Sequence, residues 1–228
     1  MKADGRRELK YQISGDAALS LEKTLPLILR RDPHAGPEGR YRVRSLYFDD
    51  WDVSAFTEKL AGVERRAKYR LRYYGDAPEY LVYEVKEKLG DLCRKRSERV
   101  TLRQAEAMEA GLDFPAETPL LREFQILRES RRLVPAVIVE YDRAPFVLDA
   151  SRTRVTLDLD VRAVSPSAGF LSGKGAALPV LEPGAQVQEV KSDEFLPLQA
   201  ALALGDTPKQ RTAVSKYCMC LAALQGHI

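Results

Sequence analysis

The 228-residue sequence contains few of the side chains that most enzymes use as nucleophiles or imidazole bases. It has three cysteines and two histidines. Three cysteines cannot form a full disulfide framework, so we expect a reduced, cytoplasmic protein. His34 falls in a loop and His227 at the end of the sequence, and neither is a good candidate for a general base. Catalysis that depends on cysteine or histidine is therefore not favoured.

Long apolar runs and a large excess of one charge sign are also absent. No run approaches the roughly 20 residues of a membrane-spanning helix, and the basic start MKADGRR is not followed by the apolar stretch of a signal peptide. The 36 basic and 33 acidic residues give a net charge of only +3. We therefore expect neither membrane insertion nor nucleic-acid binding, and an anion site must come from local segregation of charge.

The sequence does contain charged residues that alternate with apolar ones in three neighbouring stretches. Period-2 alternation places each set on one face of a β-strand. The sets are Arg66, Lys68, Arg70 and Arg72, then Glu84, Lys86 and Lys88, then Arg94 and Arg96. The ordinary interpretation is a solvated sheet face, but solvated faces usually mix signs and the first set is entirely positive. A bound polyanion would relieve its repulsion.

The order of turn and strand patterns predicts an α+β fold in a single domain spanning residues 1–228. Eight mainly antiparallel strands are enough to close a small barrel, with helices packed outside and a polar, basic lumen. The expected strands cover residues 7–14, 41–49, 65–74, 79–88, 92–102, 135–148, 154–164 and 187–192. The expected helices cover residues 16–31, 52–60, 103–133 with a break near Pro115, 195–204 and 212–224. We expect residues 165–178 to form a mobile loop and Trp51 to pack in a strand-to-helix corner.

Several carboxylates fall within the expected strands, where charge is costly unless it is exposed or paired. They are Glu8, Glu84, Glu140, Asp158, Asp160 and Glu189. Glu8, Glu84 and Glu189 each lie two residues before a lysine, and a simple ion pair within the strand would explain each of these three alone. Their repetition also suits a phosphate chain held by Lys and Arg beside a hard divalent cation. Such a site performs phosphoryl transfer mainly by positioning and charge neutralisation.

Nine short segments, in order along nearly the whole sequence, carry a family resemblance. They are RRELKY, YRVRSLYFDD, KYRLRYYG, YEVKEK, RKRS, VEYDR, RVTLDLD, QEVKSD and SKY. Together they resemble the VTC domain, the polyphosphate polymerase branch of the CYTH-like triphosphate tunnel metalloenzymes. The resemblance implies an eight-stranded antiparallel tunnel that binds a nucleoside triphosphate with Mn²⁺ or Mg²⁺. It also implies transfer of the terminal phosphoryl group of ATP to a growing polyphosphate chain.

The same resemblance implies roles for individual residues. Phosphate binding falls to basic residues along the chain, seven of which are also implied in catalysis, and metal binding falls to Glu189. The seven are Lys10, Arg70, Arg72, Lys86, Arg143, Arg154 and Lys216. The other phosphate-binding residues are Arg6, Lys95, Arg96 and Lys191.

One departure from the family pattern bears on the reaction. The ExExK signature of the phosphatase branch has two glutamates, but Arg6 occupies the first position here and leaves only Glu8 and Lys10. The lost carboxylate favours the polymerase over a two-metal hydrolase. A hydrolase of tripolyphosphate or nucleoside triphosphates, and a non-catalytic polyphosphate or nucleotide sensor, remain as alternatives. Passage of a product through a membrane would need a separate membrane partner.

Overall fold

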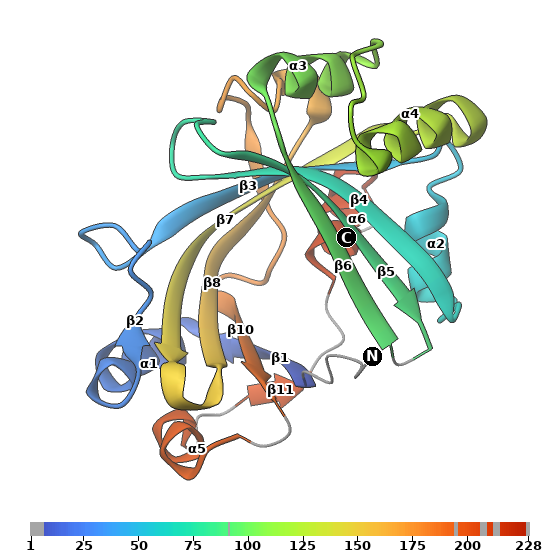
Figure 1. Cartoon of the computed structure of the whole chain (residues 1–228). Coiled ribbons are helices and arrows are strands. Elements are labelled where there is room, and N and C mark those ends of the chain that lie inside the picture. Colours follow the sequence, from blue (N-terminus) through green and yellow to red (C-terminus); the bar gives the residue numbers. More distant parts are fainter. Residues whose placement is uncertain (1–6, 91, 194–195, 206–208, 212–214, 227–228) are drawn as a thin grey trace. The chain divides into compact units, whose positions relative to one another are not determined.

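The computed structural model describes five stretches of the chain (Figure 1). The chain divides into two compact units. The described residues are 7–90, 92–193, 196–205, 209–211 and 215–226. Unit 1 comprises Met1–Arg42, Tyr141–Val161 and Pro179–Val214, and unit 2 comprises Val43–Glu140, Arg162–Leu178 and Ser215–Ile228. Each unit is therefore assembled from three separate stretches of sequence.

Both units consist mainly of β-strands, with helices between them in the sequence. Unit 1 contains β1 (Arg7–Ser14), α1 (Gly15–Thr24), η1 (Leu25–Leu27), β2 (Arg30–Arg31), η2 (Asp149–Ser151), β10 (Ala185–Ser192), α5 (Leu198–Leu204) and β11 (Lys209–Arg211). Unit 2 contains α2 (Ser54–Leu60), β4 (Arg65–Tyr74), β5 (Leu81–Leu89), β6 (Leu92–Val100), α3 (Leu102–Ala110), α4 (Pro119–Arg131), η3 (Pro166–Ala168) and α6 (Lys216–Leu224). Residues of β3 (Tyr41–Asp49), β7 (Val134–Leu148), β8 (Thr153–Val164) and β9 (Ala177–Pro179) belong to both units.

The strand pairing confirms the expected fold class, a mostly antiparallel sheet with helices around it. Among the described residues the hydrogen-bonded order is β11-β1-β10-β8-β7-β3-β4-β5-β6, with β2 on β7 and β9 on β8. Eight of these strands are eight to fifteen residues long, and the three additional ones have only two or three. The pairing path of the described strands has two ends, β11 and β6, so it does not form the closed ring that we expected. The eight long strands match the eight predicted from the sequence.

In unit 1 the apolar face of the sheet packs against helices. Leu21 of α1, Leu25 of η1 and Leu204 of α5 share a buried cluster with Val155 and Val190. Ser14 caps α1 by accepting a hydrogen bond from the backbone N–H of Ala17. Asp16 lies inside the first turn, where a carboxylate interacts favourably with the helix dipole.

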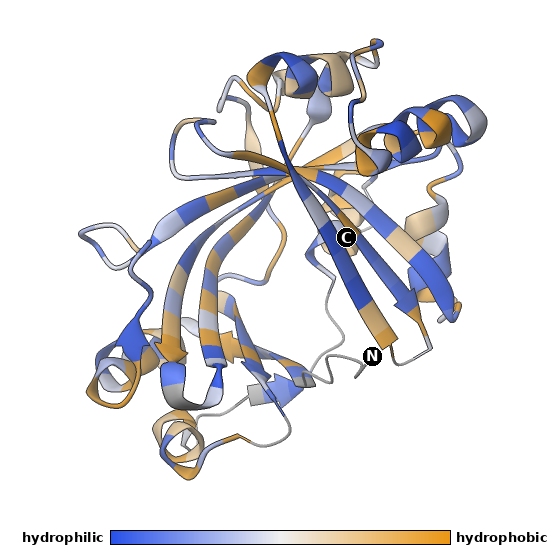
Figure 2. Ribbon diagram, in the orientation of Figure 1, coloured by the Kyte–Doolittle hydropathy of each residue, from blue (hydrophilic) through white to orange (hydrophobic). Residues whose placement is uncertain are grey.

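In unit 2 the apolar face carries the larger core. Phe124 of α4 packs edge-on against Phe48 and Tyr83, and Met108 of α3 belongs to the same cluster. Thr101 and Gln104 form a capping box that starts α3, and Thr118 caps α4. Figure 2 shows hydrophilic and hydrophobic residues alternating along strands such as β8, which leaves one face of each strand for polar side chains. The apolar core and the polar face thus follow from the same alternation.

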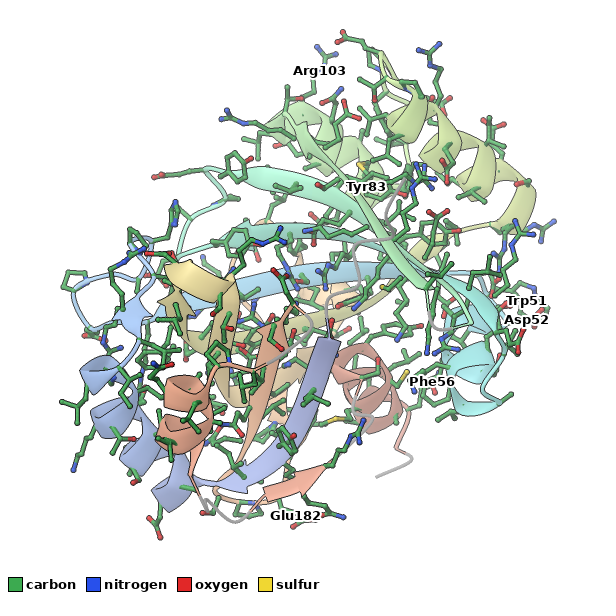
Figure 3. The ribbon with its side chains drawn as sticks, turned by 60° about the horizontal axis from the view of Figure 1, so that its bottom comes forward. Trp51, Asp52, Phe56, Tyr83, Arg103 and Glu182 are labelled. Atoms are coloured by element: carbon green, nitrogen blue, oxygen red, sulfur yellow. The ribbon has the colours of Figure 1, made fainter. Side chains whose placement is uncertain are left out.

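Two local expectations were wrong. Trp51 does not pack in a corner: its side chain is 76% exposed, and Figure 3 shows it beside Asp52 at the outside of α2. The segment 165–178 is fixed by side chains rather than left mobile. Arg44 donates hydrogen bonds to the carbonyls of Gly169, Phe170 and Lys174.

Candidate functional site

The polar face of unit 2 is built from alternate residues of β3, β4, β5 and β6. Antiparallel register places Lys86 of β5 directly between Lys68 of β4 and Lys95 of β6. Like charges directly opposite one another destabilise a sheet. Three lysines in one cross-strand row therefore form a site that an anion would stabilise.

The next row is organised by a buried carboxylate. Glu84, which is 3% exposed, accepts a hydrogen bond of 2.7 Å from Nε of Arg70. Its other partners are Lys95 and, at 3.7 Å, Arg72. Burial raises the pKa of Glu84, but these cations outweigh burial and lower it to about 2. We call Glu84, Arg70, Arg72 and Lys95 the Glu84 cluster; three cations share one carboxylate, which leaves it net positive.

Two side chains of β3 hold the arginines in place. Ser45 accepts a hydrogen bond from Arg72 at 2.8 Å, and Tyr47 accepts one from Arg70 at 2.7 Å. Burial raises the pKa of Tyr47, but Arg70, Arg72 and Lys68 more than offset this and lower it to about 8. Neither residue was predicted from the sequence. The signal was present, because Ser45 and Tyr47 alternate with the core residues Leu46 and Phe48.

Helix α6 borders this face in unit 2. Ser215 caps α6 and accepts a hydrogen bond from Lys68 at 2.6 Å, while Tyr217 stacks on Tyr47 and donates to Asp49. Lys216 is the first residue of α6 and is partly buried. The predicted phosphate-binding position Lys216 therefore follows directly on the residue that contacts the lysine row.

Arg96 is not on this face, although the resemblance implied a phosphate-binding role for it. In the register of β5 and β6, Arg96 lies opposite Val85, whereas Lys95 lies opposite Lys86. Arg96 instead pairs with Glu87 and with Glu123 of α4, at 3.0 and 2.5 Å. The ion pair with Glu123, and a weaker one with Glu87, raise the pKa of Arg96. We therefore leave Arg96 out of the proposed phosphate-binding set.

The polar face of unit 1 is built from β1, β10, β8 and β7, and we call it the Glu189 face. Its members are Glu8, Lys10, Arg143, Arg154, Thr156, Asp158, Glu189 and Lys191. Arg143 binds both oxygens of the buried Asp158, at 2.6 and 2.9 Å. Burial lowers the pKa of Arg143, but Asp158 more than offsets this and raises it well above its ordinary value. Arg143 is therefore a permanent, rigidly held cation.

The remaining predicted positions come together on the Glu189 face, with one exception. Lys10 is the register partner of Glu189 and forms a 2.7 Å ion pair with Glu8. Lys191 contacts Glu189 at 2.7 Å, and Arg154 contacts Asp32 at 3.1 Å. The exception is Arg6, which lies outside the described residues.

The alternation of polar and apolar residues along β8 breaks at one residue. Asp160 has a positive φ of 51°, which is a local departure from strand geometry. Beyond it, Arg162 does not join Arg154 and Asp158 but pairs with Glu140 at 3.0 Å. Arg162, Glu140 and Arg44 therefore form a separate buried ion network in unit 2.

A divalent cation fits the Glu189 face only with help from other ligands. In the part of the chain that the structure describes, no three His, Cys, Asp or Glu side chains gather as a metal site. Asp158 is occupied by Arg143, and Glu8 by Lys10. Mg²⁺ and Mn²⁺ are often held by one or two protein ligands together with substrate phosphates. Glu189 is paired as well, with Lys191 at 2.7 Å, and it can serve in that way once phosphate oxygens bind the lysine.

Comparison with known proteins identifies the family. The VTC domain family model matches residues 5–225, so the chain belongs to the VTC domain family, as the sequence motifs predicted. No curated protein matches the chain. A putative adenylyl cyclase from Hippeastrum, described as having a dominant triphosphatase activity, is similar in fold at a TM-score of 0.56 and 17% identity, with 95% of each chain covered. A putative adenylate cyclase from Bacillus halodurans has a TM-score of 0.48 and 13% identity, with 87% of each chain covered.

Within the described residues, no helix is long and apolar enough to span a membrane.

Proposed function

We propose that this chain is a metal-dependent phosphotransferase that passes the terminal phosphoryl group of ATP to a growing polyphosphate chain. The observation that carries the proposal is the row formed by Lys68, Lys86 and Lys95 beside the Glu84 cluster. Membership of the VTC domain family supports it. The cytoplasm, where ATP is abundant and thiols stay reduced, is the proposed location.

The proposed roles follow from the chemistry of the side chains. Arg70 and Arg72 would donate charge-assisted hydrogen bonds to phosphate oxygens. Lys86, Lys95, Lys10, Lys191 and Lys216 would act as point charges along the phosphates, and Arg143 and Arg154 as fixed guanidinium donors. The cation, when bound, would neutralise charge that develops on the transferred group. Glu189 would hold it.

Hydrolysis of a triphosphate is the second candidate. It is favoured by the similarity in fold to the Hippeastrum protein, for which a dominant triphosphatase activity is described. Both reactions use the same phosphate and metal contacts and differ in the acceptor, a phosphate chain or water. A sensor that binds without turnover is the non-catalytic alternative.

Incubation with ATP and Mn²⁺, followed by gel electrophoresis, separates these functions. A ladder of polyphosphate supports the proposal, whereas inorganic phosphate and ADP alone support the hydrolase. Unchanged ATP supports the sensor.

The metal role is tested by Glu189→Gln, which keeps the shape and removes the charge that a hard cation prefers. We expect turnover to collapse while metal-independent ATP binding persists. The matched control is Glu182→Gln, because Glu182 is exposed in the same unit and lies at the periphery in Figure 3. Equal turnover in the two variants at limiting Mn²⁺ would contradict the role of Glu189.

A further inference from the structure

The Glu189 face contains a buried hydroxyl with no hydrogen-bond partner among the described residues. Thr156 of β8 is 4% exposed, and its Oγ1 atom is both buried and unpaired there. Thr153 on the same strand is equally buried, yet its Oγ1 accepts a hydrogen bond from Ser151 at 2.8 Å. An unpaired buried hydroxyl costs stability. A bound ligand that interacts with the Thr156 hydroxyl would remove this cost.

The residue opposite Thr156 on β10 is Glu189. Thr156 and Glu189 are direct register partners on β8 and β10, and partners of this kind have Cβ atoms about 5 Å apart. Glu189 is itself 7% exposed. The hydroxyl and the carboxylate therefore lie next to each other on the face, and both are largely buried.

A hydroxyl opposite a carboxylate offers two oxygen ligands, which suit a hard cation better than a further phosphate contact. Arg154 and Asp158 flank Thr156 on its own strand, and Asp158 is bound by Arg143. Phosphate donors are thus already plentiful on this face, whereas oxygen ligands for a metal are scarce. A threonine or serine hydroxyl serves as a Mg²⁺ ligand in other phosphate-transfer sites.

We propose that Thr156 is a second protein ligand of the divalent cation, acting with Glu189. This inference rests on the proposed metal-dependent function. The Thr156 hydroxyl would give the cation one neutral oxygen ligand in addition to the Glu189 carboxylate. Phosphate oxygens and water would fill the remaining coordination positions.

Thr156→Val tests the proposal, because valine has the same shape without the hydroxyl. The first readout is Mn²⁺ affinity, measured by electron paramagnetic resonance. It is measured once with Mn²⁺ alone and once with Mn²⁺ and a non-transferable ATP analogue. The second readout is the melting temperature of the metal-free protein. We expect Mn²⁺ affinity to fall at least about tenfold. The melting temperature of the metal-free protein should be unchanged or higher, since an unpaired hydroxyl has been removed.

Two variants serve as controls. Thr156→Ser restores the oxygen and should keep most of the Mn²⁺ affinity. Thr153→Val makes the same substitution at a bonded hydroxyl of the same strand, so it should lower the melting temperature and leave Mn²⁺ affinity unchanged.

Wild-type Mn²⁺ affinity in Thr156→Val would overturn the inference. A drop in the melting temperature of metal-free Thr156→Val equal to that of Thr153→Val would also overturn it, because the hydroxyl would then have a structural partner. Glu189→Gln separates a failure of the role of Thr156 from a failure of the proposed metal role. If that variant loses Mn²⁺ and Thr156→Val does not, only the role of Thr156 fails; if Glu189→Gln keeps Mn²⁺, the metal role in the proposed function fails as well.

Discussion

At the scale of single residues, Glu84 sets the electrostatics of the polar face of unit 2. It is a buried anion among Arg70, Arg72 and Lys95. The carboxylate keeps the arginine side chains ordered, but one negative charge cannot balance three positive ones. The face is thus preorganised for a further anion, which raises the value of each phosphate contact because little reorganisation is needed.

Tyr47 gives this face a predicted pH dependence. The pKa of Tyr47 is lowered from 10.0 to about 8, so the folded protein releases this proton at a lower pH than the unfolded chain does. Between these two values the unfolded state binds more protons, and stability should therefore rise with pH relative to Tyr47→Phe. Phenolate absorbance and chemical denaturation across this range check the prediction. Phenolate formation only near the ordinary pKa would contradict it.

The same ionisation should weaken anion binding. A phenolate beside Arg70 and Arg72 competes with a phosphate for their charge. Tripolyphosphate affinity, measured by calorimetry, should fall as pH rises above about 8 in the wild type and stay flatter in Tyr47→Phe. Identical pH profiles for the two proteins would show that Tyr47 does not compete with the anion.

The residues of the polar faces were predictable to the extent that they depend on alternation alone. Period 2 correctly groups Arg70 with Arg72, since both contact Glu84. It cannot say which residue of the next strand is opposite, so Arg96 was grouped with them although the register selects Lys95. It also cannot foresee a left-handed residue inside a strand, such as Asp160, beyond which Arg162 pairs with Glu140. Register and backbone irregularity depend on tertiary packing.

At the scale of elements, the long strands and most helices were foreseen because their patterns are long. The strands at Arg7–Ser14, Tyr41–Asp49 and Arg65–Tyr74 have the predicted bounds. The three shortest strands were missed, since two or three residues carry no period. Helix α1 is shorter than expected: it ends at Thr24, before Pro26, and a single helical turn follows.

The segment 165–178 shows how composition misleads at this scale. Its glycines and serines suggest mobility, but Arg44 binds three of its carbonyls and Glu109 of α3 accepts hydrogen bonds from the backbone N–H groups of Phe170 and Leu171. Arg44 is 2% exposed and contacts Glu140 at 2.5 Å. The contacts come from β3, β7 and α3, far away in the sequence, and no local pattern reveals them.

Arg44→Met should release this segment. The variant removes the hydrogen bonds to Gly169, Phe170 and Lys174 and weakens the buried ion network around Glu140, a change that typically costs about 3 to 5 kcal/mol. Limited proteolysis within 165–178 and denaturant unfolding provide the measurements. Arg122→Met is the control, since Arg122 is exposed and donates to nearby carbonyls at the start of its own helix. Wild-type protease resistance in Arg44→Met would show that the segment is held by other contacts.

At the scale of the whole molecule, a net charge of +3 conceals strong local segregation. Each unit has one polar strand face that carries most of the predicted phosphate-binding residues and one apolar face covered by helices. Self-repulsion on the polar faces lowers the stability of the protein without ligand. The net charge of the chain therefore says little about the charge of its individual faces.

Tripolyphosphate should stabilise the folded protein by mass action. At a hundredfold excess over its dissociation constant the gain is about 2.7 kcal/mol, so the melting temperature should rise by several degrees, and by much more than with sulfate at equal ionic strength. Lys86→Met should reduce this rise, whereas Lys23→Met, at an exposed position in the last turn of α1, should not. Equal shifts from the two anions would mean that the polar faces are ordinary solvated surface.

The contacts that α6 makes with β3 and β4 bear on how the protein folds during its synthesis. Ser215, Tyr217 and Cys218 contact Lys68, Tyr47 and Asp49, more than 140 residues earlier in the chain. Because synthesis on the ribosome is vectorial, β3 and β4 emerge long before α6 does. The nascent chain therefore carries the lysine row for some time before Ser215 of α6 is available to bind Lys68. We expect the hydrogen bond between Lys68 and Ser215 to be among the last contacts of unit 2 to form during synthesis.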